Sequence, residues 1–334
     1  SFTTSGSSLL QEEKVNTETS DITLKGKVVG TTKDNKWNLT TEKIDYKKEG
    51  DKLISDTKTK VVNNVDKTEM EADKVETTTK FEVIIGTGNV FYKEIEKKRE
   101  LKSDKLTYND VEKIATGEGN VNYKDEKSTV TANKAVYYMK TEEIDAEGNV
   151  KYKDEKNTIT ANKAKYFMQT EEVHANGNVY YVGEGTEIRA DNAKYFAKQQ
   201  QVDATGNVKY SDKELKVTAN HVFYDEAKKI VNADGNGTFN YIPRGTTGTF
   251  VTGVYDLANE ILTTNDAYTM NYEDYKMKGT GLVYLFNTGD ATFNSNFSVT
   301  KQNFTVGGIN GTMNTVEKNI FANTMVMTSV QGVK

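Results

Sequence analysis

The stretch that decides the fold reads IDAEGNVKYKDEKNTITANKAKYFM, residues 144–168. Apolar or small side chains occupy every second position from Ile144 to Tyr152, with charged or polar side chains between them. This alternation is typical of a β-strand with one apolar face. After a polar turn, a second alternating run begins at Ile159. A one-residue shift of the alternation near Asn162 predicts a β-bulge or corner in this second strand.

The same pattern is repeated along the chain. Five glycines follow one another at intervals of 29 residues: Gly119, Gly148, Gly177, Gly206 and Gly235. The surrounding residues repeat with them, as ATGEGNVNY, DAEGNVKY, HANGNVYY, DATGNVKY and NADGNGTF. Each repeat therefore supplies two strands joined by polar turns, and stacked repeats place equivalent side chains in columns.

The columns that face the apolar side are the candidate functional surface. They consist of Val121, Tyr123, Ile144, Val150, Tyr152, Ile159, Tyr166, Val173, Val179, Tyr181, Ile188, Tyr195, Val202, Val208, Tyr210, Val217 and Tyr224. Small residues such as Ala146 and Ala161 stand among them, and Leu is scarce within the repeats. We therefore expect an interior that is not filled to native packing density. The columns could form either a structural core or a lining that contacts a ligand.

The repeat pattern covers most of the chain and predicts its domain organisation. Residues 1–20 are polar and predict a flexible tail. Residues 21–334 predict a single continuous repetitive body, because no shift of composition marks a linker. Within this body we distinguish an opening section, 21–110, regular repeats, 111–240, and divergent C-terminal repeats, 241–334.

Composition excludes several classes of protein. The net charge is -5, and Lys alternates with Asp and Glu throughout, so the concentrated basic surface that nucleic acid requires is missing. The chain has no Cys, which excludes disulfides and thiolate metal sites and fits a reducing or an oxidising compartment. No apolar run reaches the roughly 18 residues of a membrane-spanning helix. Hydrophobic residues are 35% and charged residues 28%, a balance expected of a thin two-layer β structure.

Other conspicuous residues predict no chemistry. His174 and His221 lack neighbours that could form a catalytic triad, and we expect surface positions for both. The segment that begins at Asp234 resembles a calcium loop but lacks the spaced acidic residues. We expect Trp37 to have a packing role. The asparagines that follow the repeat glycines are expected to face outward beside a bulge: Asn120, Asn149, Asn178 and Asn207. No catalytic residue, metal or cofactor is predicted.

The repeats resemble a known family. The A-x-G-N-V-x-Y core, followed by a V/I-x-A-x-x-A-x-Y strand, resembles the OstA-like repeat of lipopolysaccharide-transport bridge proteins of the LptA and LptC kind. The LptA-like pattern is clearest over residues 114–234. Residues 22–51, with Gly26 and Trp37, are similar to the opening of an LptC-type module.

This resemblance implies an all-β fold, an elongated, twisted and open β-jelly-roll (β-taco) of consecutive antiparallel strands. It also implies outer membrane biogenesis in the periplasm of a Gram-negative bacterium, and an inner-membrane anchor outside this sequence is compatible with it. The predicted columns would then form a lipid-binding groove that shields lipid A acyl chains. The implied partners are lipopolysaccharide, other Lpt-type bridge components at the inner and outer membrane, and further copies of the chain joined head to tail.

Two other classes of protein remain to be tested. A structural or adhesive β-solenoid without lipid cargo fits the periodicity, because columns alone do not distinguish parallel coils from antiparallel hairpins. Such a protein should have a close-packed interior. A polysaccharide-active enzyme on a β-helix would need clustered inward carboxylates, whereas the acidic residues here alternate toward the outer face. We therefore expect a protein that is not an enzyme.

Overall fold

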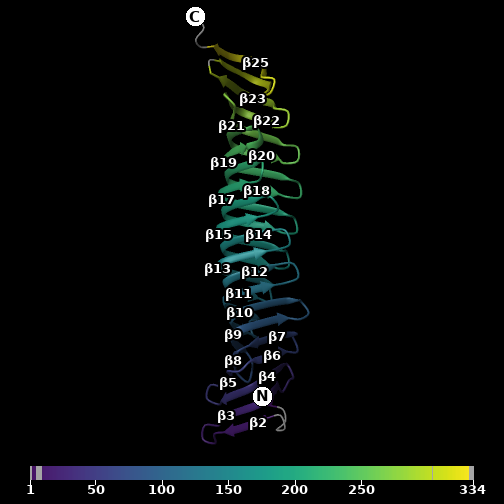
Figure 1. Cartoon of the computed structure of the whole chain (residues 1–334), viewed down its shortest axis with the longest axis vertical. Helices are drawn as coiled ribbons and strands as arrows, with labels where there is room; N and C mark the ends of the chain where they lie inside the picture. Colours follow the sequence, from purple (N-terminus) through teal and green to yellow (C-terminus); the bar gives the residue numbers. More distant parts are fainter. Residues whose placement is uncertain (1, 5–9, 303, 331–334) are drawn as a thin grey trace. The chain divides into compact units, whose positions relative to one another are not determined.

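The computed structural model describes residues 2–4, 10–302 and 304–330 (Figure 1). The chain divides into two compact units, residues 1–169 and 170–334. In the described ranges the regular structure is almost entirely β-strand, and no helix there is long and apolar enough to cross a membrane.

Among the described residues, the first unit contains fourteen strands. Their bounds are β1 (Phe2–Thr4), β2 (Leu10–Val15), β3 (Ile22–Thr32), β4 (Trp37–Lys47), β5 (Lys52–Ser55), β6 (Thr59–Asn63), β7 (Thr68–Ala72), β8 (Lys74–Thr77), β9 (Val83–Glu94), β10 (Arg99–Asn109), β11 (Ile114–Lys124), β12 (Thr129–Tyr138), β13 (Glu143–Lys153) and β14 (Thr158–Phe167). From β9 to β14 each strand pairs antiparallel with the next. Between β4 and β9 the ladder is split, because β5 with β8 and β6 with β7 form two short pairs side by side.

The second unit continues the same construction. Its elements are β15 (Glu172–Val182), β16 (Glu187–Phe196), β17 (Gln201–Ser211), β18 (Leu215–Asp225), β19 (Ile230–Tyr241), the short 3-10 helix η2 (Ile242–Arg244), β20 (Thr246–Asp256), β21 (Ile261–Tyr272), β22 (Tyr275–Leu285), β23 (Asp290–Lys301), β24 (Phe304–Asn314) and β25 (Asn319–Val330). Each strand again pairs antiparallel with the next. The described pairings are all antiparallel, so the parallel-coil alternative is wrong and the predicted β-jelly-roll is confirmed.

A bulge bends the strands at mid-length. In the β13–β14 pair, Glu147 lies opposite Lys163 and Val150 opposite Ala161, so two residues of β13 face Asn162 alone. Equivalent register shifts interrupt the other long strand pairs. The corner that the sequence predicts near Asn162 is therefore confirmed, and it recurs in each repeat.

The corner depends on a Gly-Asn pair. In β13, Gly148 has φ of 80° and Asn149 has φ of 48°, both in the left-handed region. A Cβ added to Gly148 would lie 2.6 Å from Nδ2 of Asn133, a side chain of the neighbouring strand that covers the glycine. Glycine is required here for its backbone conformation and for this close approach. The asparagines after the glycines thus have the conformational role that the sequence predicts.

The bend folds the sheet into two facing layers. Strands β11 and β14 are separated by two others, so even nearest points on them would be roughly 14 Å apart in a flat sheet. Tyr123 follows the corner of β11 and Tyr166 follows the corner of β14, yet their ring centroids are 6.1 Å apart. The two rings must therefore belong to opposite layers that face each other.

The turns consequently form two rows along the mouth between the layers. In the first unit, one row contains the turns that follow β3, β6, β9, β11 and β13, and the other contains those that follow β10, β12 and β14. Backbone hydrogen bonds join successive turns within a row, as from Ile95 N to Lys67 O (3.0 Å) and from Met139 N to Lys113 O (3.0 Å). We call the line where the two rows meet the seam.

The N-terminal residues and the domain limits differ from the expected picture. Within the predicted tail, residues 1–20, Phe2–Thr4 and Leu10–Val15 form strands that pair with β3. Residues 5–9 lie outside the described ranges. The division between the compact units follows residue 169. The three predicted sections, 21–110, 111–240 and 241–334, stay a prediction. The prediction of one continuous body from residue 21 onward stays a prediction.

Candidate lipid-binding interior and its seam

The predicted columns lie between the two layers of the bent sheet. All seventeen side chains are buried, and none is more than 5% exposed. Their sequence neighbours point the other way, as Lys151 does between Val150 and Tyr152. Period-two alternation therefore predicted their orientation correctly, whereas their contact with lipid stays a prediction.

Distance from the corner sets how deep each side chain lies. In β13, Val150 directly follows the bulge, whereas Tyr152 lies two residues nearer the turn. On the other side of the bulge, Ala146 and Ile144 repeat this order. The space near the corner is thus lined by aliphatic side chains, and aromatic rings stand at the mouth.

Tyrosine rings from the two layers meet at the mouth. The set, here called the tyrosine seam, consists of Tyr123, Tyr137, Tyr152 and Tyr166 in the first unit and Tyr181, Tyr195, Tyr210 and Tyr224 in the second. Ring centroids are 5.4 Å apart for Tyr152 and Tyr166, with an interplanar angle of 61°. The matching pair Tyr210 and Tyr224 is also 5.4 Å apart. Tilted and edge-to-face contacts of this kind stabilise by about 0.5–1.5 kcal/mol beyond burial.

The tyrosine hydroxyls bind the ends of the turns. Tyr123 donates a hydrogen bond to Asp125 Oδ2 (2.9 Å), and Tyr166 reaches the same atom from the other layer (3.2 Å). Oδ1 of Asp125 accepts the backbone N–H of Ser128, which holds the turn. Burial, followed by the charge of Asp125, raises the pKa of Tyr123, so its hydroxyl remains protonated and can donate.

At one place in the second unit the space between inward side chains is small. Among Leu215, Phe239 and Phe250 it is about 10 Å³, roughly the volume that admits one water. In the first unit the ring of Tyr166 contacts Tyr123 and Tyr152 of the facing layer. Side chains, rather than strand pairing, thus hold the seam shut.

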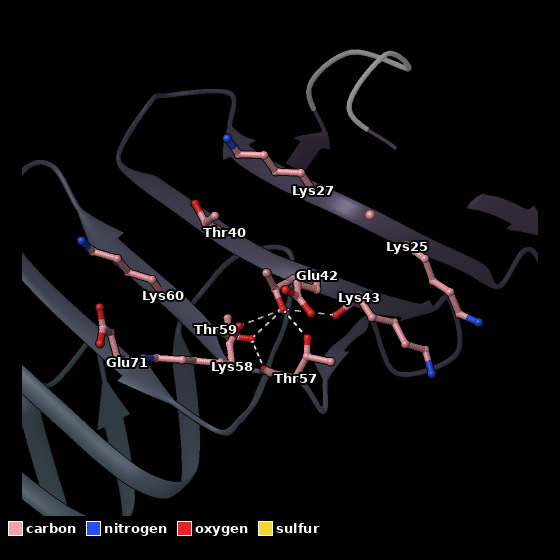
Figure 2. Close-up of a pocket in the computed structure, with 12 residues that line it drawn as sticks. Lys25, Lys27, Thr40, Glu42, Lys43, Thr57, Lys58, Thr59, Lys60 and Glu71 are labelled. Carbon is pink, nitrogen blue, oxygen red and sulfur yellow. Dashed lines mark hydrogen bonds between the residues drawn. The ribbon is translucent and has the colours of Figure 1, made fainter. Parts of the chain in front are cut away.

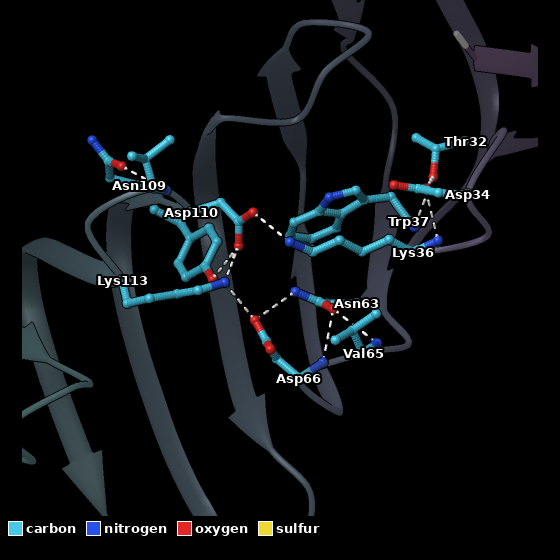
Figure 3. Close-up of polar contacts among 12 residues, drawn as sticks. Thr32, Asp34, Lys36, Trp37, Asn63, Val65, Asp66, Asn109, Asp110 and Lys113 are labelled. Atoms are coloured by element: carbon cyan, nitrogen blue, oxygen red, sulfur yellow. Dashed lines mark hydrogen bonds and ion pairs between the residues drawn. The ribbon is translucent and has the colours of Figure 1, made fainter.

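Charged side chains close the seam in the N-terminal part of the first unit (Figure 3). Lys36 Nζ lies 2.7 Å from Asp110 Oδ2, and Lys113 Nζ lies 2.6 Å from both Asp110 Oδ1 and Asp66 Oδ2. Lys36 and Asp66 belong to one row of turns, Asp110 and Lys113 to the other. We call these four residues the N-terminal clasp. Burial raises the pKa of Asp110, but hydrogen bonds from Lys113 and Lys36 outweigh it and hold the pKa below its ordinary value.

A second ion pair crosses the seam farther along the first unit. Arg99 Nη1 lies 2.9 Å from Glu142 Oε1 and donates to the hydroxyl of Tyr137 (3.1 Å). Both charged side chains are less than a fifth exposed. Gln169 donates to the other carboxylate oxygen of Glu142. We call Arg99 and Glu142 the arginine clasp. Their ion pair connects the two rows of turns beside Tyr137 of the tyrosine seam.

The repeats match a known protein family. The family described as "LptA/(LptD N-terminal domain) LPS transport protein" matches residues 60–172 and, in an overlapping match, residues 100–201. Residues 60–201 are therefore similar to the LptA and LptD N-terminal domain family. The predicted OstA-like resemblance is thereby confirmed over a stretch of under half the chain. The LptC-like opening at residues 22–51 precedes this LptA-type stretch and stays a prediction.

Solved structures give a more distant likeness. One is LptH from Pseudomonas aeruginosa, titled the LptA homologous periplasmic component of the conserved lipopolysaccharide transport device. It is 21% identical, with a TM-score of 0.28, and the alignment covers 30% of this chain and 75% of LptH. Among curated proteins none matches the chain.

A polar hollow lies where the ladder splits, largely before the LptA-type stretch (Figure 2). Its volume is about 910 Å³, and five lysines and two glutamates contribute to its lining: Lys25, Lys27, Lys43, Lys58, Lys60, Glu42 and Glu71. Beneath it, the hydroxyls of Thr41, Ser55 and Thr59 hydrogen-bond to one another at 2.7–3.0 Å. Sequence patterns did not predict this hollow, because it results from the break between β5 and β6.

His221 corrects the expectation that it lacks partners. Its Nδ1 lies 2.8 Å from Asp234 Oδ2, and its Nε2 contacts Asp203, so the ring bridges three strands on the outer face. Partial burial lowers the pKa of His221, but hydrogen bonds to Asp234 and Asp203 outweigh it and raise the pKa above its ordinary value. The described part of the chain holds no cluster suited to a metal ion. The arrangement is a structural bridge.

Trp37 has the packing role that the sequence predicts. It is buried, and its ring stacks on Phe81 with centroids 5.4 Å apart. An edge contact with Tyr108 connects it to the N-terminal clasp, because the Tyr108 hydroxyl donates to Asp110 (2.9 Å).

Proposed function

We propose that this chain binds lipopolysaccharide and carries its acyl chains between the two layers of the bent sheet. The match of residues 60–201 to a lipopolysaccharide-transport family supports transport as the general role. The observation that carries the finer proposal is the set of buried apolar columns in each unit, which in the first unit lie behind a seam that side chains close. Such a seam can open without loss of a strand pair.

The energetics favour exchange of ring contacts for lipid contacts. Burial of an acyl chain of about twelve carbons contributes roughly 10 kcal/mol before ordering costs, at about 0.8 kcal/mol per CH2 group. Separation of one tyrosine pair forfeits only about 1 kcal/mol beyond its burial, and the lipid covers the same surface. Contacts of this kind lack direction, so the chains can slide along the columns.

The proposal includes a location and partners. We place the protein in the periplasm, between the inner and outer membranes, with other Lpt-type components at each end and with an inner-membrane anchor supplied by a segment outside this sequence. In the second unit, Phe321, Met325 and Val326 on β25 are exposed apolar side chains. Exposed apolar side chains on a strand favour contact with another β-strand. This supports head-to-tail assembly with a second copy or a related component.

Photo-crosslinking tests the lipid proposal. A photoreactive residue at Val150, Tyr152 or Val179 should capture lipopolysaccharide, whereas the same residue at the outward Lys151 should not. Mass spectrometry of lipid that co-purifies with the native protein identifies the cargo. Equal labelling at Val150 and Lys151 would contradict binding in the interior.

A structural protein without lipid cargo is the second candidate, because the inward side chains are buried and the space among Leu215, Phe239 and Phe250 is only about 10 Å³. This candidate predicts that no lipid co-purifies and that no interior position is labelled. The same crosslinking series therefore separates the two functions.

A further inference from the structure

The corner of β19 has a sequence that distinguishes it from the corners of the other repeats. Residues 234–238 read Asp-Gly-Asn-Gly-Thr. Asn236 is thus followed at the second position by a hydroxyl side chain, with no proline between them, which is the pattern of an asparagine that accepts an N-linked glycan. The equivalent asparagines of the regular repeats, Asn120, Asn149, Asn178 and Asn207, have Asn, Lys, Tyr and Lys at that position. Among the repeat asparagines, the pattern is therefore specific to Asn236.

An acidic residue separates Asn236 from the other matches to this pattern. The chain also has Asn-x-Ser/Thr at Asn38, Asn296, Asn303 and Asn310, and none of these has an acidic residue two positions before the asparagine. Asp234 stands at that position before Asn236. A carboxylate beside the acceptor offers an ion-pair partner to a cationic side chain of a modifying enzyme. Asn236 is therefore the strongest candidate acceptor in the chain.

The three side chains of the pattern are exposed together on the outer face of the second unit. Asp234, Asn236 and Thr238 are all exposed, whereas Gly237 between the last two is buried. The carboxylate of Asp234 contacts His221, but its side chain is still 53% exposed. The hydroxyl of Thr238 shares a hydrogen bond of 2.6 Å with the hydroxyl of Thr218, which is also exposed. An enzyme can therefore reach the carboxylate, the amide and the hydroxyl from one side.

The backbone at the acceptor lies outside both strand ladders. Against β18, the register of β19 stops at Asp234 and resumes at Thr238, and against β20 it stops at Asp234 and resumes at Gly237. Asn236 consequently has no register partner on either side, and its φ of 58° places it in a bulge. Access to its side chain does not require a strand pair to separate.

The amide of Asn236 is also free, unlike that of several equivalent asparagines. Nδ2 of Asn120 donates to Asp104 (2.9 Å), and Nδ2 of Asn207 donates to Asp191 (3.0 Å). The side chain that covers the corner glycine of β19 is Asn220 instead of an aspartate. The side chain of Asn236 makes no hydrogen bond to any described residue. Its amide nitrogen is therefore available as the reacting atom.

We propose that Asn236 is modified with an N-linked glycan, supplied by an oligosaccharide that a diphosphate links to a polyprenyl lipid. A glycosyltransferase outside the cytoplasm joins Nδ2 of Asn236 to the anomeric carbon of the oligosaccharide. The bond from that carbon to the phosphate oxygen breaks, the lipid diphosphate leaves with the bonding electrons, and the amide gives one proton to a base of the enzyme. The modification rests on the periplasmic location proposed above, but it is independent of lipid in the interior.

Mass spectrometry of the full chain, purified from the organism that produces it, tests the site. The peptide that contains Asn236 should have the added mass of an oligosaccharide. Thr238→Val keeps the branched shape but removes the hydroxyl, and should lower the modified fraction at least about tenfold, whereas Thr238→Ser should retain it. Thr249→Val, opposite Thr238 on β20, is the matched control and should leave the modified fraction unchanged. Equal modification of the Thr238→Val variant and the parent would overturn the acceptor site.

A second pair of variants tests the carboxylate. Asp234→Asn removes the charge with little change of shape and should lower the modified fraction about tenfold. His221→Gln breaks the contact with Asp234 but leaves the carboxylate, and should have no effect. Modification of Asn310, which is also exposed, to the same extent as Asn236 would overturn the role of Asp234.

Cell fractionation separates failure of this site from failure of the proposed function. An unmodified Asn236 in chain recovered from the periplasm would overturn the glycan site, and capture of lipopolysaccharide at Val150 in the same preparation would leave the proposed function intact. Chain recovered from the cytoplasm would overturn the proposed location and the glycan site with it.

Discussion

The seam of the first unit is closed in two different ways, by charges toward its N-terminal end and by tyrosine rings in the repeats. The N-terminal clasp and the arginine clasp connect the two rows of turns through direct ion pairs. The tyrosine seam connects them through ring contacts whose hydroxyls bind the turn aspartates. The strength of the ion pairs depends on pH and salt concentration, whereas an apolar ligand can replace the contacts between the rings. The two regions should therefore open under different conditions.

The largest effect is expected from loss of a ring. Tyr166 contacts both Tyr123 and Tyr152, and its hydroxyl binds Asp125. Tyr166→Ala should lower the free energy of unfolding by about 3–5 kcal/mol, as for other buried aromatic residues. Chemical denaturation measures this. In the control Tyr180→Ala, which removes an outward ring, the loss should be below about 1 kcal/mol; equal losses would mean that the rings do not hold the layers together.

A smaller effect is expected at the corner, on which both regions depend. Gly148→Ala adds left-handed strain and a clash with Asn133, and should cost about 2 kcal/mol. Gly185 has φ of 74° with nothing within 4 Å of its added Cβ, so Gly185→Ala should cost only about 1 kcal/mol from backbone strain. Thermal unfolding compares the two. Identical losses would show that the close approach to Asn133 has no energetic role.

The N-terminal clasp should contribute less, because its side chains are 13–33% exposed. Asp110→Asn should lower the free energy of unfolding by about 1–2 kcal/mol, with a smaller difference in high salt. The pKa of Asp110 is lowered by folding, so its contribution is present above about pH 3.8, its ordinary value, and is lost as pH falls through the folded value. Hydrogen exchange at turns 64–67 and 110–113 should rise on acidification before exchange at the tyrosine seam does. If exchange at these turns and at the tyrosine seam rose at the same pH, the two regions would not be closed independently.

The smallest effect is expected at His221, on the outer face of the second unit. Folding raises its pKa above 6.5, so its contribution is fully present below pH 6.5 and is lost as pH rises through the folded value. The variant His221→Gln should therefore lose under about 1 kcal/mol at pH 6, and the difference from the parent should shrink by pH 9. Denaturation at both pH values measures this. If the stability difference between parent and variant grew with pH, the proposed contribution of the His221 contacts with Asp203 and Asp234 would be wrong.

The sequence predicted the parts of the fold that depend on local alternation. Period-two spacing identified the inward side of Val150 and Tyr152, and the shift near Asn162 identified the corner. One further signal was available: in the repeats, the side chain that covers a corner glycine precedes it by fifteen positions, as Asp104 precedes Gly119 and Asn133 precedes Gly148.

The closure of the seam could not be predicted from the sequence. Lys36 and Asp110 are 74 residues apart, and they meet only because the sheet bends so that their two turns face each other. The ring contacts across the layers were also missed, because the sequence does not show which rings of the facing layer Tyr166 meets.

The most direct test is the distance across the tyrosine seam with and without lipid. The chain has no cysteine, so spin labels can be placed at Thr141 and Lys156, in opposite rows of turns, and at Lys127 and Lys156, in the same row, as a control. Double electron–electron resonance should show that bound lipid A increases the distance between Thr141 and Lys156 and leaves the distance between Lys127 and Lys156 unchanged. Lipid A that binds while the distance between Thr141 and Lys156 stays constant would contradict entry of acyl chains through the seam.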